Sequence, residues 1–188
     1  MPTPIPRKID SEEILVRFIN DRDFKSKILD AQKFIHKSVL LPHQGGVSLQ
    51  REKYCNENCC KKISKGFLVN SNKVYVGFLL FIKSDFDKFI EKYKSENRPD
   101  FEAEIISTPL DEELKLIGKS ENIYTNTKGY PAHADIIYLN PAIRGDESTA
   151  TAIRSFAKKF SEKLCKIVID DMPNEKQYLK NSFSSYFK

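Results

Sequence analysis

The feature that most constrains this fold is a continuous apolar run from Val74 to Ile82, which contains no charged side chain. Successive side chains of a strand point to opposite faces, so a run that is apolar at every position predicts a strand covered on both faces. We therefore expect this strand to lie centrally in a sheet. A helix predicted near residues 85 to 94 follows it and covers the sheet with apolar side chains spaced three and four apart: Phe86, Phe89, Ile90 and Tyr93.

The remaining segments mix the two periodicities. Alternating polarity predicts a strand over Val47–Arg51, and two more strands are expected over residues 101–107 and 134–139. Helices are predicted over residues 52–65, 111–118 and 147–168. The inner face of the last of these consists of Ile153, Phe156, Phe160, Leu164 and Ile167.

The first element after the N-terminal prolines is predicted to be a helix. Asp10 and Glu13 have the spacing of a capping box, and an apolar face follows at Ile14, Leu15, Phe18 and Ile19. Residues 21–42 fit either a short helix or a helix that runs into a strand.

Together these elements predict one α+β domain over residues 1–188, with a small mixed sheet covered by helices. A chain of 188 residues is long enough for one domain and marginal for two. Prolines within residues 1–8 predict an extended arm over 1–9. The polar and aromatic tail, residues 173–188, is expected to dock on the body or on a partner.

The composition indicates a compartment more clearly than a ligand. No segment approaches the roughly 20 apolar residues that span a bilayer, and Met1 to Pro6 lacks the apolar core of a signal peptide. We therefore expect a cytoplasmic protein without a membrane partner. The net charge of +5 is only mildly attractive to polyanions. No complete catalytic signature or phosphate-binding loop is present, and we expect no cofactor.

Two local sequences place a histidine beside a predicted strand: Leu41 to Arg51 and Tyr130 to Ile137. In the first, His43, Ser48 and Arg51 could orient an anionic ligand, because glycines permit close backbone approach and guanidinium is a planar donor fork. In the second, a partly buried His133 would have the near-neutral pKa that acid–base catalysis needs. We predict that Ser48, Arg51 and His133 converge on one cleft. The alternative is that His133 is a structural histidine satisfied by local hydrogen bonds.

Four short pieces carry a resemblance: Arg17-Phe-Ile, Gln32-Lys-Phe-Ile, Gly46 to Arg51, and Pro131-Ala-His-Ala134. In their order they resemble a family of small, uncharacterised bacterial proteins that share a short Leu-Ser-Val strand and a Pro-Ala-His-Ala segment. Here Val47-Ser-Leu stands in place of Leu-Ser-Val. The resemblance implies a bacterial origin and no particular activity, and it points again to Ser48, Arg51 and His133.

The cysteines give a second candidate site. Cys55, Cys59 and Cys60, with His36 and His43 upstream and Cys165 far downstream, supply thiolate and imidazole groups that suit zinc. Structural zinc sites usually have two short ligand pairs, and the second pair is missing here. We therefore expect no metal, and we interpret Cys55 and Cys59 as small side chains on one face of a helix.

The long C-terminal helix gives a candidate nucleic-acid surface. Its outer face is predicted to carry a basic stripe that Glu162 interrupts: Arg154, Lys158, Lys159, Lys163 and Lys166. Such a stripe suits phosphate contacts, although the solvated face of any core helix has the same pattern.

We also considered transferase chemistry. An early arginine, a strand serine and a later glutamate recur in ADP-ribosyltransferase-like folds, and the available residues are Arg17, Ser48 and Glu102 or Glu104. Their spacing does not support that interpretation.

These signals favour a small cytosolic bacterial binding component, a subunit of a defence or toxin-linked assembly. We expect it to contact protein partners, with nucleic acid as a second candidate ligand. The alternative is an enzyme, a hydrolase or transferase with its site around His133, Arg51 and Ser48.

Overall fold

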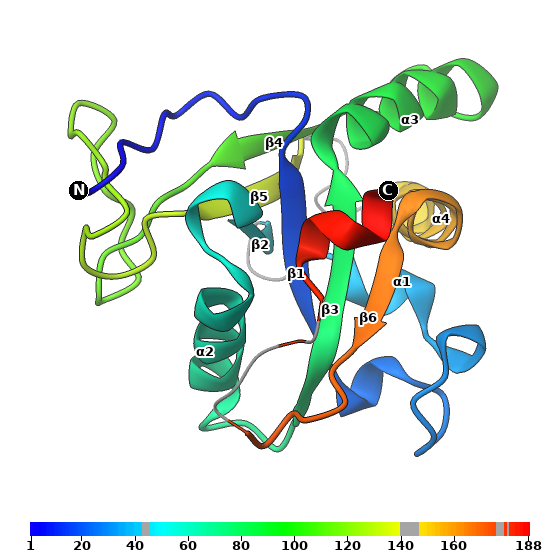
Figure 1. The fold of residues 1–188 in the computed structure, drawn as a ribbon. Coiled ribbons are helices and arrows are strands. Elements are labelled where there is room, and N and C mark those ends of the chain that lie inside the picture. The colour runs from blue at the N-terminus through cyan, green and yellow to red at the C-terminus, as the bar shows by residue number, and fades with distance from the viewer. Residues whose placement is uncertain (43–45, 140–146, 176–178, 180) are drawn as a thin grey trace.

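The described residues form one six-stranded sheet in the order β4-β5-β2-β1-β3-β6 (Figure 1). The computed structural model describes residues 1–42, 46–139, 147–175, 179 and 181–188, with the side chains of 147–149 excepted. Every strand pairing in it is antiparallel, whereas the sequence suggested a mixed sheet. The strands are β1 Ile14–Asn20, β2 Val47–Arg51, β3 Tyr75–Ile82, β4 Ala103–Ser107, β5 His133–Tyr138 and β6 Lys166–Ile169.

Helices cover both faces of this sheet, which confirms the α+β class. The first face is covered by α1 (His36–Val39), α3 (Lys83–Glu96) and α4 (Glu147–Leu164), and the second by α2 (Glu57–Leu68) and the C-terminal 3-10 helix η5 (Phe183–Phe187). We call these the α4 face and the α2 face of the sheet. The two buried apolar clusters of the domain lie between these layers, one on each side of the sheet.

Strand β3 confirms the strongest expectation. All seven residues from Tyr75 to Phe81 are buried, because the strand has neighbours on both edges and covered faces on both sides. Its partner β6 approaches closely at Gly77, where a Cβ atom would lie 2.1 Å from the Val168 carbonyl oxygen. Glycine at this position is what allows β6 to pair with β3.

The prediction of a first helix over residues 14–19 is wrong, because this segment is strand β1. Leu15 and Ile19 are buried on the α4 face and Val16 is buried on the α2 face. Neighbouring apolar residues therefore pack on opposite faces of the sheet, as they do in a strand. The contact behind the helix prediction is nevertheless present, since the Asp10 N–H donates to Glu13 Oε1 over 3.0 Å.

Other boundaries also differ from the expectations. The last helix ends at Leu164, and the branched residues that follow pair with β3 as β6, so Ile167 and Lys166 are not helical. The expected helix over 111–118 is a turn, in which Leu114 has φ 64° and is half exposed. Residues 21–42 form two 3-10 turns, η1 (Asp21–Asp23) and η2 (Ala31–Lys33), and the short α1. A 3-10 turn, η3 (Glu52–Tyr54), precedes α2.

Both terminal segments dock on the body. The arm is extended and buries Ile5 and Ile9, and the Ile5 N–H donates to the Ile123 carbonyl oxygen over 2.8 Å. In the tail, Phe183 is fully buried with its ring centroid 5.0 Å from that of Phe78. No helix in the described part of the chain has the length and apolar character needed to cross a membrane.

Candidate functional site

The structure brings two of the three predicted catalytic residues to the same face of the sheet. Strands β2 and β5 are neighbours, with Ser48 opposite Asp135 and Gln50 opposite His133. Opposite residues of an antiparallel pair point to the same face. Ser48 and His133 therefore both lie on the α2 face, and His133 is two residues along β5 from the residue opposite Ser48. His43 lies outside the described residues.

Arg51 does not join them, so the prediction of a shared cleft is wrong. It stands opposite Leu15, whose side chain belongs to the cluster on the α4 face. The strand prediction already contained this result, because Ser48 and Arg51 are three positions apart and a strand alternates its faces every residue.

Arg51 is instead a buried clamp between the sheet and the N-terminal arm. Its Nε and Nη2 donate to the two carboxylate oxygens of Glu13, each over 2.7 Å, and both side chains are almost completely buried. Its Nη1 donates to the Pro6 carbonyl oxygen and its Nη2 also to that of Lys8. All the guanidinium nitrogens are thereby engaged within the chain, which leaves no donor fork for an anionic substrate.

His133 is buried and held by local partners. It is 3% exposed, and its Nδ1 lies 2.9 Å from the Thr108 carbonyl oxygen and 3.0 Å from Thr108 Oγ1. The Thr108 hydroxyl donates to Asp135 Oδ2 over 2.7 Å. Burial lowers the pKa of His133, against the opposing effects of Asp135 and the Thr108 hydrogen bond. The ring is therefore neutral near pH 7, which suits a histidine that fixes the end of β4 to β5.

Arg17 on β1 acts on this group, because its charge lowers the pKa of His133. Its Nη1 donates to the Ser48 carbonyl oxygen over 2.9 Å, and Asp135 acts on its charge. Burial lowers the pKa of the Arg17 guanidinium, and its Nε has no hydrogen-bond partner among the described residues. Sequence reasoning paired Arg17 with Glu102 or Glu104, but the acid opposite Ser48 is Asp135. The signal that would have found Asp135 is its place two residues after His133, on the same face of the strand.

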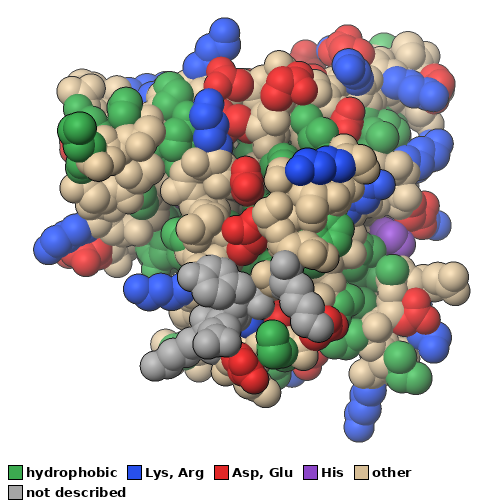
Figure 2. All heavy atoms as spheres, in the orientation of Figure 1, with side chains coloured by type: hydrophobic (Ala, Val, Ile, Leu, Met, Phe, Trp, Pro, Cys, Tyr) green, Lys and Arg blue, Asp and Glu red, His purple; other side chains and the backbone are tan. Residues whose placement is uncertain are grey.

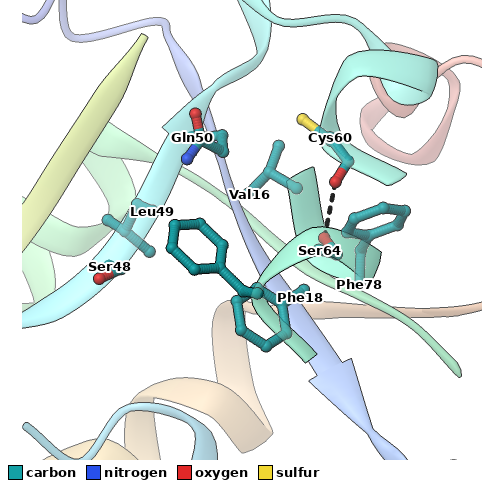
Figure 3. A pocket seen from close by; sticks show the side chains of 9 residues that line it. Val16, Phe18, Ser48, Leu49, Gln50, Cys60, Ser64 and Phe78 are labelled. Carbon is teal, nitrogen blue, oxygen red and sulfur yellow. Dashed lines mark hydrogen bonds between the residues drawn. The ribbon is translucent and has the colours of Figure 1, made fainter. Parts of the chain in front are cut away.

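The hollow beside Ser48 is too small for a substrate. It lies between β1, β2 and α2, and its lining is mostly apolar and includes Val16, Phe18 and Phe78, which Figure 3 draws. Its volume is about 10 Å³, room for a single water at most.

The cysteines are divided between the two sides of the sheet. Cys55 and Cys60 are buried on the α2 face with their Sγ atoms 3.5 Å apart, whereas Cys165 packs against the cluster on the α4 face. Burial raises the pKa of Cys60 and of Cys165, so these thiols stay protonated. His36 is also on the α4 side, where Ser161 donates to its carbonyl oxygen. In the described ranges, no three His, Cys, Asp or Glu side chains are placed to hold a metal ion together.

The predicted basic stripe on α4 is present only in part. Arg154, Lys158 and Lys163 are exposed, and Lys158 lies 3.9 Å from Glu162. Lys159 is turned toward α3, where its Nζ donates to Asn97 over 2.8 Å and lies 5.5 Å from the Tyr93 ring centroid. Lys166 is exposed on β6 and does not belong to the helical stripe.

The neighbouring α1 segment extends this surface. Burial is the largest cause that lowers the pKa of His36, and the charges of Lys158 and Lys25 lower it further, so each of these lysines acts on the imidazole. Lys25 and Lys37 are exposed. Lys163 lies four residues after Lys159 and therefore on the α3 side of the helix, away from Arg154. We call the set Lys25, Lys37, Arg154 and Lys158 the basic face.

A much larger hollow lies elsewhere, along strand β4. Its volume is about 630 Å³, and it lies between β4, the N-terminal arm and the loop after β4. Comparison of the chain with protein-family models, with curated proteins and with solved structures finds no match.

Proposed function

We propose that this chain is a cytoplasmic bacterial binding component that contacts nucleic acid through the basic face. The observation that carries the proposal is the packing of α1 against α4, which adds Lys25 and Lys37 to the exposed cations of the helix. Phosphate contacts need several cations on one surface, and the gain in affinity comes from released counterions. Glu162 is the acid that interrupts this surface, and Lys158 lies next to it.

The surroundings of the basic face support binding. Segment 21–35, next to α1, protrudes at the lower right of Figure 1, and Figure 2 shows Lys and Arg side chains there beside exposed hydrophobic ones. Ile28 is 64% exposed between Lys27 and Leu29. Cations around an exposed apolar side chain can hold a phosphate backbone while the apolar group contacts a base or sugar.

The competing enzyme interpretation has less support. Arg51 is engaged with Glu13, and His133 is buried against Thr108, so neither presents a free group to a substrate. The wider role, a subunit of a bacterial defence or toxin-linked assembly, stays a prediction.

The test is the salt dependence of binding to a 20-nucleotide oligonucleotide, single- and double-stranded, measured by fluorescence anisotropy. We expect wild-type affinity to fall steeply with salt. Arg154→Glu with Lys158→Glu should weaken binding strongly, because two phosphate contacts become repulsive. The slope of log K against log salt should fall by about 2.

The matched control is Lys62→Glu with Lys128→Glu, which makes the same change of charge on the α2 side and on a distant loop. Both lysines are exposed, so this variant should bind nearly as well as wild type. Equal losses in the two variants would show that only net charge matters. No wild-type binding at low salt would remove the proposal.

A further inference from the structure

Strand β4 is an edge of the sheet whose outer backbone groups face a groove. In the ladder between β4 and β5, the Thr108 N–H donates to the His133 carbonyl oxygen and the Leu139 N–H to that of Glu102, each over 3.0 Å. In an antiparallel ladder the residues that bond to the neighbour alternate with those that bond outward. The N–H and C=O groups of Ala103, Ile105 and Ser107 therefore point away from β5, toward the open edge.

The groove runs along this edge. Its floor is the β4 segment from Glu104 to Thr108, and its walls include Arg7, Lys8 and Ile9 of the arm. The arm does not fill it, because Thr3 and Ile5 bond to Thr125 and Ile123 instead of to β4. A volume of about 630 Å³ is within the range of binding clefts.

The walls of the groove are positively charged. Four basic side chains line it, against the single acid Glu104: Arg7, Lys8, Lys83 and Lys119. Lys83 is paired with Asp87, while Lys8 and Lys119 are exposed. Arg7 donates from Nη2 to the Ile117 and Gly118 carbonyl oxygens, and its buried Nε has no hydrogen-bond partner among the described residues.

We propose that this groove binds an extended acidic peptide segment of a partner protein, which adds to the sheet as a strand beside β4. Strand addition gives affinity through main-chain hydrogen bonds and specificity through alternate side chains. The outward groups of Ile105 and Ser107 supply the hydrogen bonds. Lys8 and Lys119 attract the acidic side chains, and Ile106 and Leu116, which are 36% and 58% exposed, contact apolar ones.

Lysines beside an edge strand also have another use, which is to prevent unwanted pairing with other strands. The two roles differ in outcome, because a protected edge rejects every added strand, whereas a binding edge selects acidic ones. The proposal concerns residues separate from the basic face, so either proposal can fail without the other.

The probes are three blocked synthetic peptides, Glu-Val-Glu-Val-Glu-Val-Glu, the same sequence with Lys in place of Glu, and the same sequence with Pro in place of Val. The proline peptide keeps the acidic charge but lacks the alternate N–H groups that a strand needs. We expect the Glu-Val peptide alone to bind in fluorescence anisotropy. It should slow amide hydrogen exchange at Ile105 and Ser107 by about tenfold or more, because these groups become hydrogen bonded.

Two variants test the two parts of the site. Ser107→Pro removes an outward N–H and leaves the bonds to β5 intact, since proline is tolerated at an edge. It should weaken binding by about tenfold, whereas Ser107→Ala should bind as wild type does. Lys8→Glu with Lys119→Glu should weaken binding by at least about tenfold at low salt, and the matched Lys62→Glu with Lys128→Glu should not.

Three results would overturn the proposal. One is equal binding of all three peptides, and another is binding that leaves the Ile105 and Ser107 amides unprotected. The third is self-association of the free protein that Ser107→Pro abolishes, which would make a second copy of the chain the occupant of the edge. Oligonucleotide binding measured on the same variants reports separately on the basic face.

Discussion

The side chain of Arg51 shows how a residue that looks functional in the sequence can be structural. Its nitrogens join Glu13 and two carbonyl oxygens of the arm, and its guanidinium carbon lies 4.8 Å from the Tyr54 ring centroid. A buried ion pair gives little net stability by itself, but removing one partner leaves the other charge buried and unpaired. The clamp therefore matters most for keeping the arm on the sheet.

At this scale we predict that Arg51→Ala lowers the free energy of unfolding by about 3–5 kcal/mol, because it leaves the Glu13 carboxylate buried without its ion-pair partner. The measurement is urea denaturation at neutral pH. Replacing both residues, Glu13→Ala with Arg51→Ala, should cost less than the sum of the single variants. Arg98→Ala, which breaks an exposed ion pair with Asp100, is the control and should cost about 1 kcal/mol or less. A loss for Arg51→Ala as small as that of the control would contradict the clamp.

Among the elements, α4 has the clearest division into an inner and an outer face. Phe156 is fully buried, with its ring centroid 4.9 Å from that of Phe101 and 5.7 Å from that of Phe86. Arg154, two residues earlier, is exposed. The inner face joins α3, α4 and the sheet, while the outer face remains available for a ligand.

For this element we expect Phe156→Ala to cost about 3–5 kcal/mol through a cavity among the aromatic rings. Arg154→Ala should cost about 0.5 kcal/mol or less, since it removes an exposed side chain. Denaturation midpoints of the two variants give the comparison. Equal midpoints would mean that the faces of α4 are assigned the wrong way round.

On the scale of the whole molecule, the C-terminal tail completes the layer on the α2 face. The Phe183 N–H donates to Glu57 Oε1 at the start of α2 over 2.7 Å, and the Phe183 ring packs on Phe78 of β3. Nearby, Lys61 of α2 pairs with Asp170 over 2.7 Å, with both side chains buried. The tail, α2 and the sheet therefore share one core.

We predict that Phe183→Ala lowers the free energy of unfolding by about 3–5 kcal/mol, because removal of the buried Phe183 ring leaves a cavity against the central sheet. A single cooperative transition should remain when fluorescence and circular dichroism are compared. Ser185→Ala, at an exposed position of the same turn, should have almost no effect. A loss of about 1 kcal/mol or less for Phe183→Ala would show that the tail is only loosely attached.

The sequence by itself determined the elements whose pattern admits one interpretation. Strand β3 is apolar at every position, and α4 places Phe156 and Phe160 on one stripe and its cations on the other, so both were predicted together with the α+β class. The α2 segment, β2 and β5 followed from similarly local patterns.

Only the tertiary structure decided the conformation of segments whose pattern fits two structures, and the contacts between residues that are distant in sequence. The apolar pattern from Ile14 to Ile19 fits either a helix or a strand that is buried on both faces. Pairing with β2 and β3 makes this segment strand β1. Arg51 meets Glu13 across 38 residues, and β4 has an open edge because the arm pairs elsewhere. Local patterns report only which side chains avoid water. Long-range pairing decides which backbone groups remain without a partner, as at the outer edge of β4, where we propose the peptide site.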